Sequence, residues 1–132
     1  MKNLQDYVLV LEQQSEDAHN LKLLLEPFRC PLVIASSAEQ VMARLNHSTP
    51  YLVILIGNHH DWPATLVARL RQRADAVGST IVALTDYHAP NWPSQEETRL
   101  FDGFLVKPLD EDVLASLIQA ARAKQSFWAT PY

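Results

Sequence analysis

Three side chains that could act together each come directly after a short apolar segment of the sequence: Glu12, Thr85 and Lys107. If these segments are parallel strands, their carboxyl ends meet at one edge of a sheet, which is where ligands bind in open α/β sheets. A carboxylate can hold magnesium, while an amine and a hydroxyl can contact the oxygens of a phosphate or another anion. We therefore expect a candidate site at this edge.

A fourth segment, PYLVILIGN at 50–58, should end at the same edge without a reactive group. It is apolar through Ile56 and then breaks at Gly57-Asn58. Such a run is typical of a strand buried on both faces of a parallel sheet. The side chain of Ile56 has no oxygen or nitrogen, so this strand ends in a residue that can only pack.

Other reactive side chains are weaker candidates for a functional site. His59-His60-Asp61 is the best remaining metal-binding candidate, but adjacent histidines in a loop point apart and no further ligand lies at zinc-like spacing. We interpret these residues as a solvated loop. Cys30 is the single cysteine, cannot form an internal disulfide, and is interpreted as a small semi-buried apolar residue.

Length and charge narrow the class of protein. The chain of 132 residues suits one domain with one core. A net charge of -4 does not favour nucleic acid, and Arg69, Arg71 and Arg73 are interpreted as solvated helix surface rather than a phosphate-binding stripe. No apolar run is long enough to span a bilayer, and the N-terminus lacks the features of a signal peptide. We expect a cytoplasmic protein without membrane contact.

Apolar periodicity predicts five strands alternating with helices. The strands are expected at Tyr7–Leu11, Leu32–Ala35, 50–56, Thr80–Leu84 and Gly103–Val106. The helices are expected to be capped at Ser15, Ser36-Ser37, Asp61 (with Pro63 in the first turn) and Asp110, with ends at Pro27 and Gly78 for the first and third. The predicted core-facing residues are Leu21, Leu24, Leu25 and Phe28; Ala38, Val41, Met42 and Leu45; Leu66, Val67, Leu70, Ala74 and Val77; and Val113, Leu114, Leu117, Ile118 and Ala121.

This element order predicts a single α/β domain, a flavodoxin-like doubly wound (βα)5 fold with a parallel sheet in the order 2-1-3-4-5. The fourth helix is expected to be irregular or shortened, because Pro90 and Pro93 interrupt its start and leave Trp92 in a loop. We expect the domain to span 1–124 and 125–132 to form a C-terminal tail or linker.

Four segments together resemble the receiver domain of bacterial two-component response regulators: VLVLEQ at 8–13, PYLVILI at 50–56, IVALT at 81–85 and FDGFLVKPL at 101–109. The resemblance covers nearly all of 7–124 and implies a signalling protein of the phosphorelay type. Receivers carry an acidic pair after the first strand and a phospho-accepting aspartate at the end of the third. A Thr or Ser follows the fourth strand, and Lys-Pro follows the fifth.

Matched onto this sequence, the acidic pair becomes Glu12 and Gln13, the acceptor becomes Ile56, and the hydroxyl and the lysine are Thr85 and Lys107. An acyl phosphate cannot form on Ile56, because its side chain is not a nucleophile. Glu12 is the one carboxylate left from the family's three. Even with a main-chain carbonyl from Asn58, we expect Mg²⁺ binding to be weak or absent.

The resemblance therefore implies a pseudo-receiver that is not an enzyme, uses no cofactor and acts by binding a protein partner. We expect Lys107 to pair with Glu12. The expected interaction face comprises Trp92, Phe104, which matches the switch aromatic of the family, and Pro108. The partner would be a separate protein, a linked effector or kinase domain, or a second copy in a homodimer.

Two alternatives stay open at this point. One is a small flavodoxin-like ligand binder or enzyme that takes a small anion or a nucleotide through Glu12, Thr85, Lys107 and His59. The other is a receiver that accepts phosphate on a residue other than Ile56.

Overall fold

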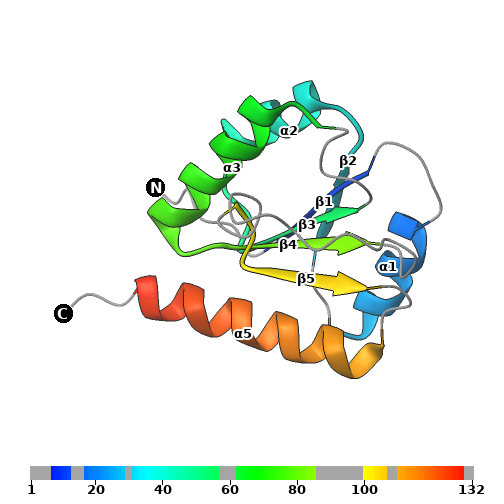
Figure 1. Ribbon diagram of the computed structural model, residues 1–132. Helices are drawn as coiled ribbons and strands as arrows, with labels where there is room; N and C mark the ends of the chain where they lie inside the picture. The colour runs from blue at the N-terminus through cyan, green and yellow to red at the C-terminus, as the bar shows by residue number, and fades with distance from the viewer. Residues whose placement is uncertain are drawn as a thin grey trace.

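The computed structural model describes residues 7–12, 17–28, 31–56, 62–85, 100–106 and 110–129. Within these ranges the chain forms five strands and four α-helices (Figure 1). The strands are β1 (Val8–Leu11), β2 (Leu32–Ala35), β3 (Leu52–Ile56), β4 (Thr80–Thr85) and β5 (Gly103–Val106). The helices are α1 (Asp17–Leu25), followed by a 3-10 turn (Glu26–Phe28), α2 (Ala38–Leu45), α3 (Ala64–Val77) and α5 (Glu111–Ala129).

The five strands form one parallel sheet in the order β2-β1-β3-β4-β5. This order and the α/β class confirm the flavodoxin-like fold predicted from the alternation of strands and helices. Among the described helices, none combines the length and the apolar character that a membrane crossing requires.

Helices cover both faces of the sheet, α2 and α3 on one and α1 and α5 on the other (Figure 1). Successive residues of a strand point to opposite faces, so each strand contributes to two cores. In β3, Val53 and Leu55 join the core under α2 and α3, whereas Leu52, Ile54 and Ile56 join the core under α1 and α5. All five residues of β3 are buried, which confirms the prediction of a strand covered on both faces.

Three predicted helix ends are confirmed by their hydrogen bonds or backbone angles. The Ser37 hydroxyl accepts the N–H of Gln40 at 3.2 Å and caps α2. Gly78 ends α3 with φ 78°, a left-handed conformation that glycine adopts without steric cost. The Asp110 carboxylate accepts the N–H of Asp112 at 3.0 Å at the start of α5, as expected.

The predicted start of α3 was wrong. Pro63 is the residue before the helix, with φ -58° and ψ 136°, and provides no side-chain cap. Its extended ψ angle keeps it out of the first turn, so α3 begins at Ala64. Asp61, the predicted cap, lies outside the described residues, as do Ser15 and the segment around Trp92 where the fourth helix was expected.

The predicted core faces are largely confirmed, with Val113 as the main error. Val113 is 41% exposed, because the buried stripe of α5 is centred on Leu114 and Ile118 and Val113 lies about 100° away around the helix. Val77 is half-buried rather than buried. The helix α5 continues to Ala129, beyond the predicted end of the domain at 124.

Candidate functional site

The strand register brings the predicted site positions to one edge of the sheet, which we call the carboxyl edge. Ile56 pairs with Leu84, the residue before Thr85. Thr85 in turn pairs with Val106, the residue before Lys107. The backbone therefore brings the ends of β3, β4 and β5 together, as expected for parallel strands. The side chain of Thr85 and all of Lys107 lie outside the described part of the chain.

Glu12 follows β1 at the same edge. Its preceding residue, Leu11, pairs with Leu55, which makes Glu12 a neighbour of Ile56 on the adjacent strand. Glu12 is only 6% exposed. A buried carboxylate is costly unless it is paired or hydrogen-bonded, so this position suits the predicted partner Lys107. The Glu12–Lys107 pair stays a prediction.

Ile56 packs into the core at the point where a receiver would carry its acceptor. Its residue exposure is 6%, and it belongs to the apolar cluster that includes Ile54, Leu84 and residues of α1 and α5. A side chain in this setting contributes about 1.5–3 kcal/mol through burial and supplies no group for proton or phosphoryl transfer.

Several predicted residues cannot be placed. Gln13, Asn58, Trp92 and Pro108 lie outside the described residues, as does the His59-His60-Asp61 cluster. Within the described ranges, no three His, Cys, Asp or Glu side chains gather closely enough to hold a metal ion.

Phe104, the predicted interaction residue on β5, is half-buried. Its ring lies 5.4 Å from the ring of Phe101, centroid to centroid, at an interplanar angle of 60°. Phe101 is buried and belongs to the core under α2 and α3. This tilted arrangement is favourable for aromatic pairs and gives Phe104 a fixed support.

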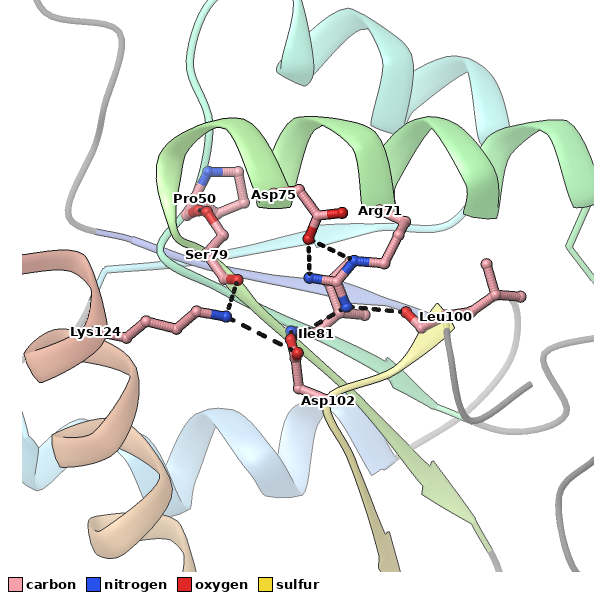
Figure 2. A network of polar contacts seen from close by, with 8 residues as sticks. All are labelled: Pro50, Arg71, Asp75, Ser79, Ile81, Leu100, Asp102 and Lys124. Carbon is pink, nitrogen blue, oxygen red and sulfur yellow. Dashed lines mark hydrogen bonds and ion pairs between the residues drawn. The ribbon is translucent and has the colours of Figure 1, made fainter. Parts of the chain in front are cut away.

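Sequence reasoning missed a polar network at the opposite edge of the sheet (Figure 2). Arg71, interpreted from sequence as solvated surface, has a side chain only 14% exposed and pairs with Asp75 and Asp102. Lys124 of α5 also pairs with Asp102. The Arg71–Asp75 spacing of four residues was a signal for the helical pair, whereas Asp102 carried no local signal.

Arg73 was also misinterpreted as solvated surface. It is half-buried, and its Nη2 donates to the carbonyl oxygen of Leu45 at 2.7 Å, which joins α3 to the end of α2. A buried hydroxyl pair lies near that helix end: Tyr7 Oη donates to the carbonyl oxygen of Ser48 at 3.4 Å and accepts from Ser48 Oγ at 3.2 Å. Burial raises the pKa of Tyr7 above its usual value of 10.0, an effect that the Ser48 hydrogen bond partly offsets.

Comparison with solved structures identifies the architecture. A receiver domain protein from Clostridium thermocellum superposes with a TM-score of 0.70 at 18% identity, over 93% of this chain and 98% of that one. A CheY-like receiver domain from Methylobacillus flagellatus gives 0.70 at 24% identity, over 89% and 98%. The fold is that of a response regulator receiver domain.

The same receiver fold also occurs within a longer chain. NtrX from Brucella abortus, solved in complex with ADP, matches with a TM-score of 0.74 at 17% identity, over 91% of this chain but 26% of NtrX. Neither the models of protein families nor the curated proteins give a match to this sequence.

Proposed function

We propose that this chain is a receiver-like signalling domain of a two-component or phosphorelay system that accepts no phosphate at the end of β3 and acts by binding another protein. The observation that carries this proposal is Ile56. In a receiver fold, the end of β3 is the position at which the resemblance implies an aspartate. Here the position holds a buried aliphatic side chain continuous with the core.

Loss of the acceptor is matched by loss of metal ligands. Magnesium needs oxygen ligands in near-octahedral geometry, with carboxylates supplying the charge. Of the three carboxylates that the resemblance implies, Gln13 replaces one and Ile56 another, which leaves Glu12. One buried carboxylate beside a neutral amide makes a poor magnesium site. Without nucleophile or metal, the chain is proposed to be neither an enzyme nor a phosphoryl carrier.

Binding to a partner protein is the way in which we propose that the domain signals. The proposed face includes Phe104, which the buried Phe101 ring supports, together with Trp92 and Pro108. Aromatic anchors of this kind dominate the energetics of many interfaces. The partner is proposed to be a separate protein, an effector or kinase domain of the same chain, or a second copy. The receiver fold within NtrX supports the second option.

The test compares the wild-type chain with a Gln13→Asp/Ile56→Asp double variant, which restores two carboxylates. Each is incubated with acetyl phosphate and Mg²⁺, and intact mass is measured with and without the phosphodonor. We expect no gain for the wild type and a gain of one phosphoryl group for the variant. A matched Gln13→Asn/Ile56→Asn variant should gain none.

A stoichiometric gain on the wild-type chain would overturn the proposal, and peptide mapping would then locate the non-standard acceptor. If neither protein is labelled, the wild-type result still stands. Where circular dichroism shows that the double variant is folded, the remaining residues at the carboxyl edge are then insufficient for phosphoryl transfer.

A further inference from the structure

The apolar residues of the strand β5 do not by themselves fix its register against β4. The strand has four residues and, among the strands that the structure describes, is an edge strand that pairs with β4 alone. Phe104 packs against the core under α2 and α3, whereas Leu105 packs against the core under α1 and α5. A slip of one residue would exchange these faces, and both faces would still receive apolar side chains. The apolar pattern alone therefore specifies the register weakly.

Asp102, the residue before β5, forms hydrogen bonds with β4 that are possible in one register alone. Its backbone N–H donates to the carbonyl oxygen of Ile81 at 2.7 Å, and its Oδ2 accepts the N–H of the same residue at 2.8 Å. One residue thus satisfies both backbone groups of Ile81. After a slip, Phe101 or Gly103 would face Ile81, and neither has a side-chain acceptor.

Two cations from opposite faces of the sheet hold this carboxylate (Figure 2). Arg71 of α3 places Nη1 at 3.3 Å from Oδ2 of Asp102, and Lys124 of α5 places Nζ at 3.8 Å from Oδ1. Charged groups in part-buried positions are screened less than those on open surface. The Arg71 side chain is 14% exposed, that of Asp102 31% and that of Lys124 37%, so the reduced screening applies mainly to the pair of Arg71 and Asp102.

Arg71 and Lys124 each make further contacts, with a residue of the same helix or with a carbonyl oxygen close to the start of a strand. The Arg71 guanidinium contacts Oδ1 of Asp75 at 2.9 and 3.1 Å and donates to the carbonyl oxygen of Leu100 at 3.2 Å. Lys124 donates to the carbonyl oxygen of Ser79 at 3.2 Å, just before β4. The network therefore joins α3, α5 and the starts of β4 and β5.

We propose that Asp102 is a positioning residue which, held between Arg71 and Lys124, fixes the register of β5 and thereby the orientation of Phe104. The inference deepens the proposed function, since Phe104 belongs to the proposed interaction face. It also gives that face a fixed arrangement that needs no phosphorylation. The register itself does not depend on what the face binds.

The test measures nuclear Overhauser effects (NOEs) and amide hydrogen exchange. In the wild type we expect NOEs between the Phe101 and Phe104 rings and between the paired residues of β4 and β5. Asp102→Ala should weaken these NOEs and raise exchange of β5 amides by about tenfold or more, while amides of β1 and β3 change little. Asp102→Asn, which keeps an acceptor for Ile81, should retain the ring NOEs, a result that a role in charge alone would not give.

Lys124→Met removes one of the two cations that hold Asp102, and should raise exchange of the β5 amides less than Asp102→Ala does, because Asp102 keeps its contacts with Ile81 and Arg71. Lys22→Met on α1 and Asp112→Ala on α5 are matched controls, which should change neither the ring NOEs nor the exchange of the β5 amides. The proposal is overturned if Asp102→Ala leaves β5 unchanged, or if exchange rises equally throughout the sheet. Neither result bears on whether Ile56 prevents phosphorylation, because phosphorylation is read by mass on the wild-type chain.

Discussion

At the scale of single residues, Ile56 changes what the end of β3 can do. An aspartate at this position would have to be kept ionised next to the buried Glu12, and two close carboxylates raise the cost of ionising either one. An isoleucine removes that repulsion and extends the apolar core to the carboxyl edge. The same substitution that removes the chemistry is therefore expected to stabilise the domain.

This reasoning predicts that Ile56→Asp is strongly destabilising. Burying a carboxylate in an apolar cluster and losing the packing should lower the free energy of unfolding by about 3 kcal/mol or more. Ile34→Asp is the control, because Ile34 is 43% exposed on the edge strand β2, and it should cost less than about 1 kcal/mol. Urea unfolding of the two variants measures the difference. Equal costs would mean that Ile56 is not part of the core.

The raised pKa of Tyr7 predicts that the folded domain loses stability at alkaline pH. This pKa is raised in the folded state by burial, so the unfolded chain loses the phenolic proton first as the pH rises past 10.0. The stabilisation is fully present below pH 10.0 and is lost as the pH rises toward the folded pKa. Tyr7→Phe should lose stability less steeply above pH 10.0 than the wild type, as followed by urea unfolding across this range. Parallel curves would contradict the assignment to Tyr7.

At the scale of elements, the sequence predicted most of what depends on local pattern. The buried run of β3, the Ser37 cap and the Gly78 stop follow from short-range rules and are confirmed. The errors arose where tertiary context decides. Pro63 was placed one position too far into its helix, and Val113 follows the apolar period of α5 but lies beyond the stripe that the sheet covers.

Gly78 allows a test of how much one backbone conformation at the end of α3 contributes to the stability of the domain. With φ 78°, an alanine would be forced into a left-handed conformation, so Gly78→Ala should lower the free energy of unfolding by about 1 kcal/mol. Gly103→Ala is the control. A Cβ atom there would meet Val82 Cγ1 at 3.7 Å, an ordinary contact. Thermal unfolding should therefore separate the two variants, and a larger loss at Gly103 would contradict this account.

At the scale of the whole molecule, the two ends of the sheet differ in how far their residue contacts could be predicted from the sequence. The carboxyl edge could be predicted because each candidate residue ends a strand or directly follows one, and the parallel topology then brings them together. The network at the other edge joins Arg71, Asp102 and Lys124 over more than fifty residues of sequence. Such a juxtaposition depends on the packing of α3 and α5 against the sheet and has no local signature.

The last prediction concerns the response of the whole fold to a phosphate mimic. A ligand that binds only the folded state raises the melting temperature, by about 5–10 °C for a domain of this size at a hundred times its Kd. Beryllium fluoride with Mg²⁺ mimics an aspartyl phosphate and requires the carboxylates that are missing here. We expect no change in melting temperature for the wild type and a rise for Gln13→Asp/Ile56→Asp, each measured against fluoride and Mg²⁺ without beryllium. A rise for the wild type would mean that Glu12 and the other groups at the carboxyl edge still form an anion site, and that Ile56 removed only the covalent step.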